Sequence, residues 1–267
     1  MSLHVYRFGP QTGRAIVAVH GLKGYGGRWR VFAEEQLSDF QVIAPDLRGH
    51  GLSPGEPPWT LEQHAQDVLD VLDRHGLGQA PVLGHSLGAT VAVYLARLAP
   101  ERVDRLVLLD PGMALPGPLA ERRARDALYV PTFDNPEEAV AERARFWPRE
   151  AHRLVREEVA NHLGCGSDRR WRWRYSVPAA VTAYSELARP AVTPPAHIPT
   201  LLAVAGRHDA ANPSYPDACR RVLNRFAVVE LDCGHHIHLE RPVEAGRLIR
   251  DFLAEAASGP PVPDEAR

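Results

Sequence analysis

Residues 80–100 read APVLGHSLGATVAVYLARLAP, in which an apolar run passes through GHSLG (residues 84–88) into a helical pattern. A serine between two glycines in this setting fits a nucleophile turn between a strand and a helix, because such a turn strains the serine backbone and leaves little room beside it. At the start of a helix, free backbone N–H groups also stabilise developing negative charge. The alternative is a serine that only caps the helix. The setting on both sides favours a catalytic Ser86.

Five other short apolar runs resemble the one that precedes Ser86. Continuous apolar runs of this length suit strands that are buried on both faces, as in a parallel sheet. Helical patterns separate them, most clearly in residues 60–76, where Thr60 and Gln63 fit a capping box and Gly76 fits a helix end. This alternation predicts an α/β fold with a doubly wound, mostly parallel sheet flanked by helices. The six runs lie within residues 14–21, 40–46, 80–86, 103–111, 200–209 and 226–235.

The strand–helix alternation stops between about residues 111 and 199. This stretch carries Arg- and Glu-rich helical patterns between proline-rich flanks and shows no buried-strand signal. We interpret residues 112–198 as a helical cap inserted into a core formed by residues 1–111 and 199–257. The proline-rich residues 258–267 are expected to form a flexible tail.

Composition excludes several classes of function. The formal net charge of -2 gives no field that would recruit nucleic acid or an anionic membrane. Three scattered cysteines predict neither a disulfide framework nor a zinc site. No signal-peptide pattern or membrane-spanning run occurs, so we expect a cytoplasmic protein. The single lysine, Lys23, lies in no phosphate-binding loop, and no metal or organic cofactor is expected.

A serine nucleophile needs a base, and the base needs a carboxylate that orients it. Among three histidines after the last strand pattern, His235 lies at the strand exit, where a loop can reach the sheet edge. His236 fits an ordinary solvated or core imidazole better, and His238 could order the loop. Asp209, just after the preceding strand, is the preferred acid, and Asp110, one strand after the serine, is the alternative.

The oxyanion that forms during acyl transfer needs two hydrogen-bond donors. The backbone N–H of Leu87, directly after the nucleophile, is one candidate. The backbone N–H of Leu22 is the other, because the glycine-rich loop HGLKGYGG (residues 20–27) follows a predicted strand and can bring its backbone close to a substrate.

Together these segments resemble the α/β-hydrolase superfamily. His20-Gly21 resembles its oxyanion-loop signature, DLRGHGLS (residues 46–53) is similar to its D-x-R-G-x-G-x-S segment, and GHSLG resembles its nucleophile motif. GRHD (residues 206–209) resembles the acid loop, and CGHHIHLERP (residues 233–242) resembles a motif whose first histidine is catalytic. The resemblance implies a cap after the sixth strand. A serine at position 86 separates the chain from the branches that use an aspartate nucleophile.

The predicted cap contains DRRWRWRYSVPAA (residues 168–180), in which arginines and aromatic residues alternate. Nucleic-acid binding is disfavoured by the overall charge. An extended segment whose aromatic face packs within the cap is the plainer interpretation. A third interpretation is that the aromatic side chains form a wall over the pocket that binds the acyl group.

We therefore expect a serine hydrolase that cleaves a small or medium ester, lactone or thioester through an acyl-enzyme. One alternative is a carbon–carbon bond hydrolase or cofactor-free lyase. Its substrates carry carboxylates, so it would aim arginines such as Arg125, Arg172 or Arg174 into the pocket. The other is a hydrolase-fold small-molecule receptor with negligible turnover. The shared motifs do not choose among these.

Overall fold

The protein is described by a computed structural model over residues 2–208 and 212–255. The predicted tail, residues 258–267, and Asp209 lie outside the described residues. No helix in the described ranges is both long and apolar enough to cross a lipid bilayer.

A seven-stranded sheet forms the centre of the described chain, with strand order β1-β3-β2-β4-β5-β8-β9. β1 pairs antiparallel with β3, and the other neighbouring pairs are parallel. All six predicted strands are present. No pattern in the sequence predicts β1, because this edge strand is only half-buried and lacks an apolar run. The strands are β1 (Val5–Phe8), β2 (Arg14–Val19), β3 (Phe40–Pro45), β4 (Ala80–His85), β5 (Val103–Leu109), β8 (Thr200–Ala205) and β9 (Phe226–Leu231).

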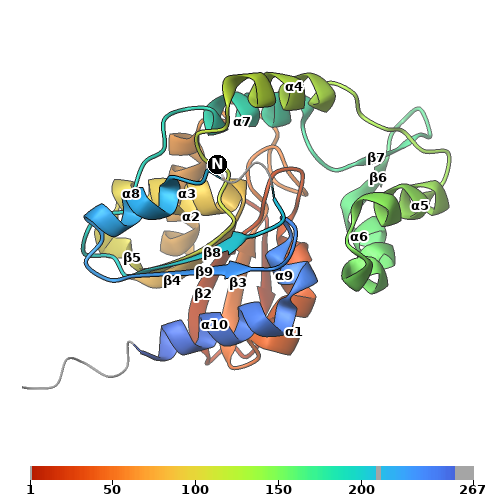
Figure 1. Ribbon diagram of the computed structural model, residues 1–267. Helices are drawn as coiled ribbons and strands as arrows, with labels where there is room; N and C mark the ends of the chain where they lie inside the picture. Colours follow the sequence, from red (N-terminus) through yellow and green to blue (C-terminus); the bar gives the residue numbers. More distant parts are fainter. Residues whose placement is uncertain (1, 209–211, 256–267) are drawn as a thin grey trace, which may run out of the picture.

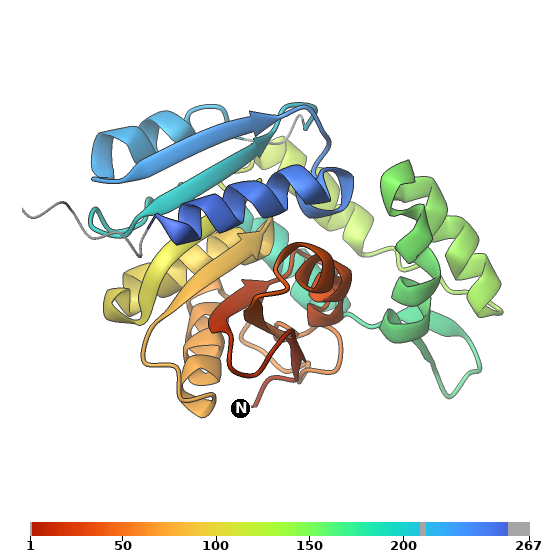
Figure 2. The same ribbon diagram turned by 90° about the horizontal axis from the view of Figure 1, so that it is seen from below.

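Helices cover both faces of the sheet, which gives three layers (Figures 1 and 2). Alternate strand residues point to opposite faces, so Val17 packs in one apolar cluster and Ile16 in the other. The first cluster contains α2 (Leu61–Arg74), α3 (Leu87–Leu98) and α8 (Tyr215–Val222). The second contains α1 (Arg30–Gln36), α9 (Ile237–Glu240) and α10 (Pro242–Ala254). Short 3-10 helices η1 (Gly26–Trp29) and η2 (Pro100–Arg102) complete this part of the fold.

The predicted helix over residues 60–76 is confirmed as α2. The Thr60 side chain accepts a hydrogen bond from the backbone N–H of Gln63, at 3.2 Å. Gly76 follows the helix with φ = 64°, the left-handed conformation that commonly ends a helix. The ends of this helix can be predicted from the sequence because each helix cap depends on residues only a few positions apart.

The segment between β5 and β8 leaves the sheet and returns to it. It follows the fifth strand of the described chain rather than the sixth, because a single strand, β1, precedes β2. It also contains a short hairpin that the sequence analysis missed. Its elements are α4 (Gly117–Ala127), α5 (Pro136–Phe146), η3 (Arg149–Leu154), α6 (Val155–His162), β6 (Leu163–Cys165), β7 (Trp171–Trp173) and α7 (Val177–Leu187). In Figure 1, α4 and α7 lie across the end of the sheet, and α5, α6 and the hairpin lie to one side.

Ion pairs join this inserted segment to the core. Arg28 in η1 pairs with Glu158 in α6, and both side chains are almost fully buried. Arg153 in η3 forms a bidentate pair with Glu35 in α1, at 2.8 and 2.9 Å. The buried pair has the larger effect on stability if one partner is removed, because the other charge is then left in a poorly solvated site.

The nucleophile helix α3 packs very close to the sheet. A Cβ atom at residue 88 would lie 2.2 Å from the carbonyl oxygen of Val19, whereas one at residue 78 would have no heavy atom within 4 Å. We predict that Gly88→Ala lowers the free energy of unfolding by about 1–3 kcal/mol, because backbone must move to admit the methyl group. Urea unfolding measures this, with Gly78→Ala as the matched control. Equal effects of the two substitutions would contradict the packing argument.

Candidate active site

Ser86 occupies a strained turn between β4 and α3. Its backbone has φ = 54° and ψ = −119°, a conformation that residues with a Cβ rarely adopt. The flanking glycines are required by space, since a Cβ at residue 84 would lie 2.4 Å from the carbonyl oxygen of Gly88. The Ser86 N–H donates to the carbonyl of Leu109 in the neighbouring strand at 3.0 Å. Strain that is held in place this firmly is typical of functional positions.

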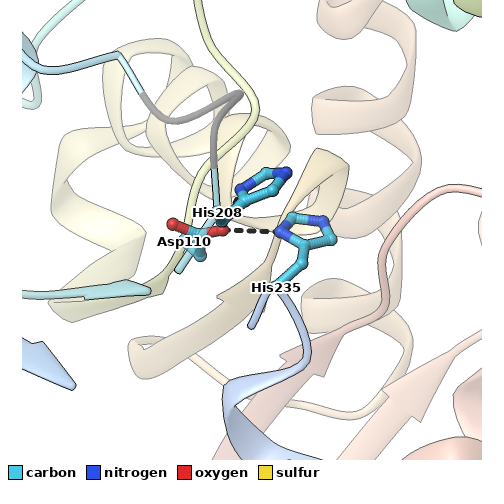
Figure 3. Close-up of side chains that lie close together, drawn as sticks. All are labelled: Asp110, His208 and His235. Atoms are coloured by element: carbon cyan, nitrogen blue, oxygen red, sulfur yellow. Dashed lines mark hydrogen bonds and ion pairs between the residues drawn. The ribbon is translucent and has the colours of Figure 1, made fainter. Parts of the chain in front are cut away.

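His235 lies in the loop between β9 and α9 and lines the same cavity as Ser86. Its Nδ1 atom is 2.6 Å from Oδ2 of Asp110 (Figure 3). A carboxylate only accepts hydrogen bonds, so Nδ1 carries the proton and Nε2 of the neutral ring is left as the acceptor. The His235 carbonyl lies 2.8 Å from Nε2 of the buried His85, and Glu240 accepts from the N–H of Gly234 at 2.7 Å. These bonds fix the loop on both sides of the imidazole.

Asp110 is the first residue after β5 and is fully buried. Its backbone also has a positive φ, 44°. Oδ1 accepts a hydrogen bond from the N–H of Ala205, and Oδ2 lies 2.6 Å from Nδ1 of both His235 and His208. Burial by itself raises the pKa of Asp110, but contact with the two imidazoles outweighs it and holds the pKa below its ordinary value. Asp110 is therefore ionised at neutral pH.

The sequence offers two candidate acids for the triad, Asp209 and Asp110, and the structure describes the surroundings of Asp110. Asp209, the preferred acid, lies outside the described residues. Asp110, the alternative, is hydrogen-bonded to His235. The signal that pointed to Asp110 was its position at the end of the strand after the serine, and the parallel pairing of β4 with β5 explains why that position is close to Ser86.

A cavity of about 180 Å³ opens at Ser86 and His235. The inserted segment supplies much of its wall through Leu115, Leu119, Leu187 and Tyr184. Two cations also line it, Arg28 from η1 and Arg123 from α4. The cavity thus combines an apolar wall with a polar end at the strained serine, which is the usual character of a small-molecule site.

The two residues predicted to donate to the oxyanion are Leu22, which lines the same cavity as Ser86, and Leu87, which follows Ser86 in the chain. Leu22 lines the cavity, and Leu87 is the first residue of α3, where a helix leaves its N–H groups without intrahelical partners. The Leu22 loop is held by His20, whose Nδ1 is 2.8 Å from the Gly21 carbonyl and whose Nε2 accepts from the N–H of Leu47. Burial lowers the pKa of His20 well below its usual value, so this ring stays neutral.

The DLRGHGLS segment (residues 46–53) is hydrogen-bonded to the same loop. Asp46 accepts hydrogen bonds from the N–H groups of Gly26 and Leu52, at 2.6 and 2.8 Å. Arg48 forms a buried bidentate pair with Asp67 of α2, at 2.6 and 2.8 Å. The segment therefore holds the glycine-rich loop against the core and makes no contact with the cavity in the described residues.

Comparison with known proteins agrees with this architecture. The sequence profile of the family described as "alpha/beta hydrolase fold" matches residues 14–242. The chain belongs to this family. It is 36% identical over 260 residues to "Lipase LipV" of Mycobacterium tuberculosis, covering 95% of this chain and 98% of that protein. "Esterase YbfF" of Escherichia coli is 30% identical over 246 residues, covering 89% and 92% of the two chains.

Solved structures show the same α/β-hydrolase fold. The structure of E-2-(acetamidomethylene)succinate hydrolase superposes with a TM-score of 0.82 at 20% identity, over 94% of this chain and 95% of that chain. A marine microorganism esterase gives a TM-score of 0.78, also at 20% identity, over 94% of this chain and 99% of that one. At this identity the likeness concerns the fold. The family predicted from the sequence motifs is confirmed by the profile match and the 36% identical relative, and the predicted fold class is confirmed by the observed sheet.

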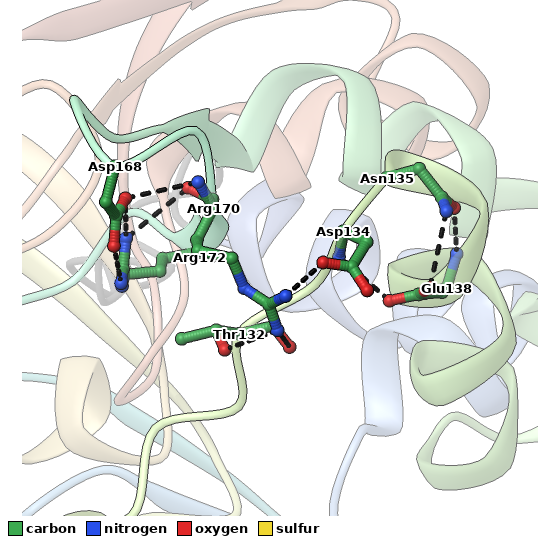
Figure 4. Close-up of polar contacts among 7 residues, drawn as sticks. All are labelled: Thr132, Asp134, Asn135, Glu138, Asp168, Arg170 and Arg172. Carbon is green, nitrogen blue, oxygen red and sulfur yellow. Dashed lines mark hydrogen bonds and ion pairs between the residues drawn. The ribbon is translucent and has the colours of Figure 1, made fainter.

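Two arginines line the cavity, but none of the three named for the carbon–carbon bond hydrolase does so within the described residues. Arg125 is exposed and pairs with Glu121 on its own helix. Arg172 pairs with Asp168 on the outer hairpin (Figure 4), and Arg174 donates to the carbonyl of Leu163. The cations that do line it, Arg28 and Arg123, were missed because a helical pattern alone does not reveal which face turns toward the site.

The alternating segment 168–180 packs within the inserted segment, as its plainer interpretation predicted. Trp173 is buried in a small apolar cluster with Phe133, Val159 and Leu163. None of Trp171, Trp173 and Tyr175 lines the described cavity, so the aromatic wall is not formed by these rings. The outward-facing arginines are occupied by local ion pairs, such as Arg170 with Asp134 (Figure 4).

Asp110, His208 and His235 are the described residues whose ligand atoms come close enough to hold a metal ion. Both imidazole Nδ1 atoms lie 2.6 Å from the same carboxylate oxygen. Ligands around a tetrahedral zinc ion are about 3.4 Å apart, given metal–ligand distances near 2.1 Å. His235 Nδ1 makes a hydrogen bond to this oxygen, so this contact is that of a proton donor and its acceptor rather than of two metal ligands.

Proposed function

We propose that the chain is a serine hydrolase that cleaves a carboxylic ester through an acyl-enzyme. The observation that carries this proposal is the 2.6 Å bond between His235 Nδ1 and Asp110, which leaves Nε2 as a base along the cavity that contains the strained Ser86. The names of the relatives, a lipase and an esterase, support ester hydrolysis at the level of the family. We assign the orienting carboxylate to Asp110 in place of Asp209.

In the first half-reaction, Ser86 Oγ attacks the carbonyl carbon while His235 Nε2 takes its proton. The tetrahedral oxyanion accepts hydrogen bonds from the N–H groups of Leu22 and Leu87, each worth about 10²–10³ in rate in comparable sites. The carbon–oxygen bond to the leaving group then breaks, and the imidazolium returns the proton to the departing alcohol. Asp110 stabilises the imidazolium during this step.

In the second half-reaction, His235 removes a proton from water, whose oxygen attacks the acyl carbon. The bond to Ser86 breaks, the serine recovers its proton from the imidazolium, and the carboxylic acid leaves. Every group that this scheme requires comes from the chain, the ester and water. The acyl part fits against Leu115, Leu119 and Leu187, which makes a small or medium apolar acyl group the best match.

We further propose that residues 112–198 act as the cap of this site. The support is that α4 and α7 of this segment supply Leu119, Arg123, Tyr184 and Leu187 to the cavity wall. A cap built this way selects the substrate, while the core residues 1–111 and 199–257 supply the reacting groups.

We expect a fluorophosphonate probe to label wild-type protein on Ser86 and short-chain p-nitrophenyl esters to be hydrolysed. Ser86→Ala should abolish labelling and lower kcat/KM by at least about 10³-fold, because the nucleophile is lost. Thermal unfolding provides the folding control, since alanine at this position keeps the same packing. Full esterase activity in Ser86→Ala would overturn the mechanism, and absent turnover in the wild type would favour the receptor alternative.

A paired substitution tests the choice of acid. Asp110→Asn should lower kcat by about 10³–10⁴-fold, because an amide cannot stabilise the imidazolium and favours the wrong tautomer of His235. Asp209→Asn should stay within about tenfold of wild type. The reverse order of effects would assign the acid to Asp209.

A further inference from the structure

We propose that Glu158 of α6 is a positioning residue for the oxyanion site, and that it acts through Arg28 on the glycine-rich loop (residues 20–27) that carries Leu22. The proposal rests on the proposed function, since it assumes that the N–H of Leu22 binds the oxyanion. Under this account the inserted segment lines the cavity and also holds one of the two oxyanion donors in place.

A buried ion pair with two hydrogen bonds joins Arg28 to Glu158. Nε of Arg28 donates to Oε2 of Glu158 at 3.3 Å, and Nη2 donates to Oε1. The two side chains are only 7% and 2% exposed, so salt and water screen their attraction very little. Arg143 of α5 lies 3.9 Å from the same carboxylate. Glu158 is thus a carboxylate between two cations, and without it Arg28 and Arg143 would repel each other in a poorly solvated site.

Arg28 directly follows the glycine-rich loop and packs against it. A Cβ atom at residue 24 would lie 3.0 Å from Nη1 of Arg28, so this end of the guanidinium lies beside the loop backbone. The N–H of Arg28 donates to the carbonyl of Tyr25 at 3.2 Å. Arg28 also lines the same cavity as Leu22 and Ser86. It therefore connects the buried ion pair to the backbone that carries the oxyanion donor.

The inserted segment contacts the loop at two further places. The buried ring of Tyr25 stacks on the buried ring of His162 in α6, with centroids 4.6 Å apart and planes inclined by 8°. Nζ of Lys23 lies 5.6 Å from the centroid of the Tyr175 ring, within range of a cation–π attraction. Both contacts adjoin residue 24, so they act on the same part of the loop as the buried ion pair.

On the core side, hydrogen bonds reach the loop near its two ends. His20 accepts from the N–H of Leu47, and Asp46 accepts from the N–H of Gly26. Leu22 lies between these two points, next to the residues that the inserted segment contacts. Loss of the buried ion pair should therefore displace the middle of the loop while its ends stay in place.

A small displacement of the loop is enough to affect the reaction. An oxyanion donor works when its nitrogen lies within about 2.7–3.1 Å of the oxyanion, and loss of one donor costs about 10²–10³ in rate. The apolar wall that binds the acyl group does not depend on this N–H. The buried ion pair should therefore affect the rate of acylation rather than the affinity for the ester.

The test breaks two ion pairs that join the inserted segment to the core and compares the results. In single-turnover kinetics with p-nitrophenyl butyrate, Glu158→Gln should lower the acylation rate by about 10–100-fold and leave the dissociation constant of the ester within about twofold, because a displaced donor loses most of its effect. Glu35→Gln, which breaks the exposed pair with Arg153 outside the cavity, is the matched control and should keep both values within about twofold of wild type.

A double variant separates positioning from folding stability. Arg28→Met combined with Glu158→Gln removes the cation together with the carboxylate, so the local net charge is unchanged and the thermal stability lost in Glu158→Gln should return in part. The acylation rate should nevertheless stay low, because the link to the loop is still broken. This variant also decides the matter if Glu158→Gln alone does not fold.

Each outcome bears on the proposal. Recovery of both thermal stability and acylation rate in the double variant would mean that the pair is only structural and would overturn it. An unchanged acylation rate in Glu158→Gln would do the same, as would a weaker affinity for the ester at an unchanged rate, which would assign Arg28 to substrate binding. A wild-type protein that forms no acyl-enzyme would instead overturn the proposed function, and this inference with it.

Discussion

The strained backbone at Ser86 is the constraint on which the rest of the site depends. A residue with a Cβ at φ = 54° and ψ = −119° costs about 1–3 kcal/mol. The turn persists because β4 is buried in the centre of the sheet and α3 packs on it through the apolar cluster that contains Val82, Leu87 and Val91. Burial of these side chains stabilises the fold by more than the turn costs. The glycines at 84 and 88 remove the steric clash that would otherwise force the helix away.

Parallel strands bring the remaining groups to the same place. Ser86, Asp110, His208 and His235 each follow a different strand, and the carboxyl ends of β4, β5, β8 and β9 lie side by side at one edge of the sheet. Chemistry that joins residues far apart in sequence therefore needs no unusual loop, only a short extension beyond each strand. The inserted segment supplies much of the apolar wall of the cavity at this edge and one cation, Arg123, while the second cation, Arg28, comes from η1.

Much of this arrangement is readable from the sequence, and the exceptions have physical reasons. Buried parallel strands and the N-cap of α2 at Thr60 depend on local patterns, so both can be predicted from the sequence. β1 and the β6–β7 hairpin were missed because edge strands and short hairpins bury few residues. The contact between Asp110 and His235 depends on which strands are neighbours in the sheet. Order along the chain does not show this, and it therefore favours Asp209 over Asp110 as the acid. The proximity of His208 to Asp110 likewise joins the ends of two neighbouring strands, so no local pattern in the sequence indicates it.

The central claim is that Ser86 becomes covalently acylated during turnover. Intact-mass measurement after rapid acid quenching of the enzyme with a short-chain p-nitrophenyl ester tests this directly. The account predicts a species heavier by one acyl group, formed with the burst of nitrophenol and located on the peptide that contains Ser86. Turnover without such a species, in an experiment fast enough to resolve the burst, or acylation located at another residue, would contradict it.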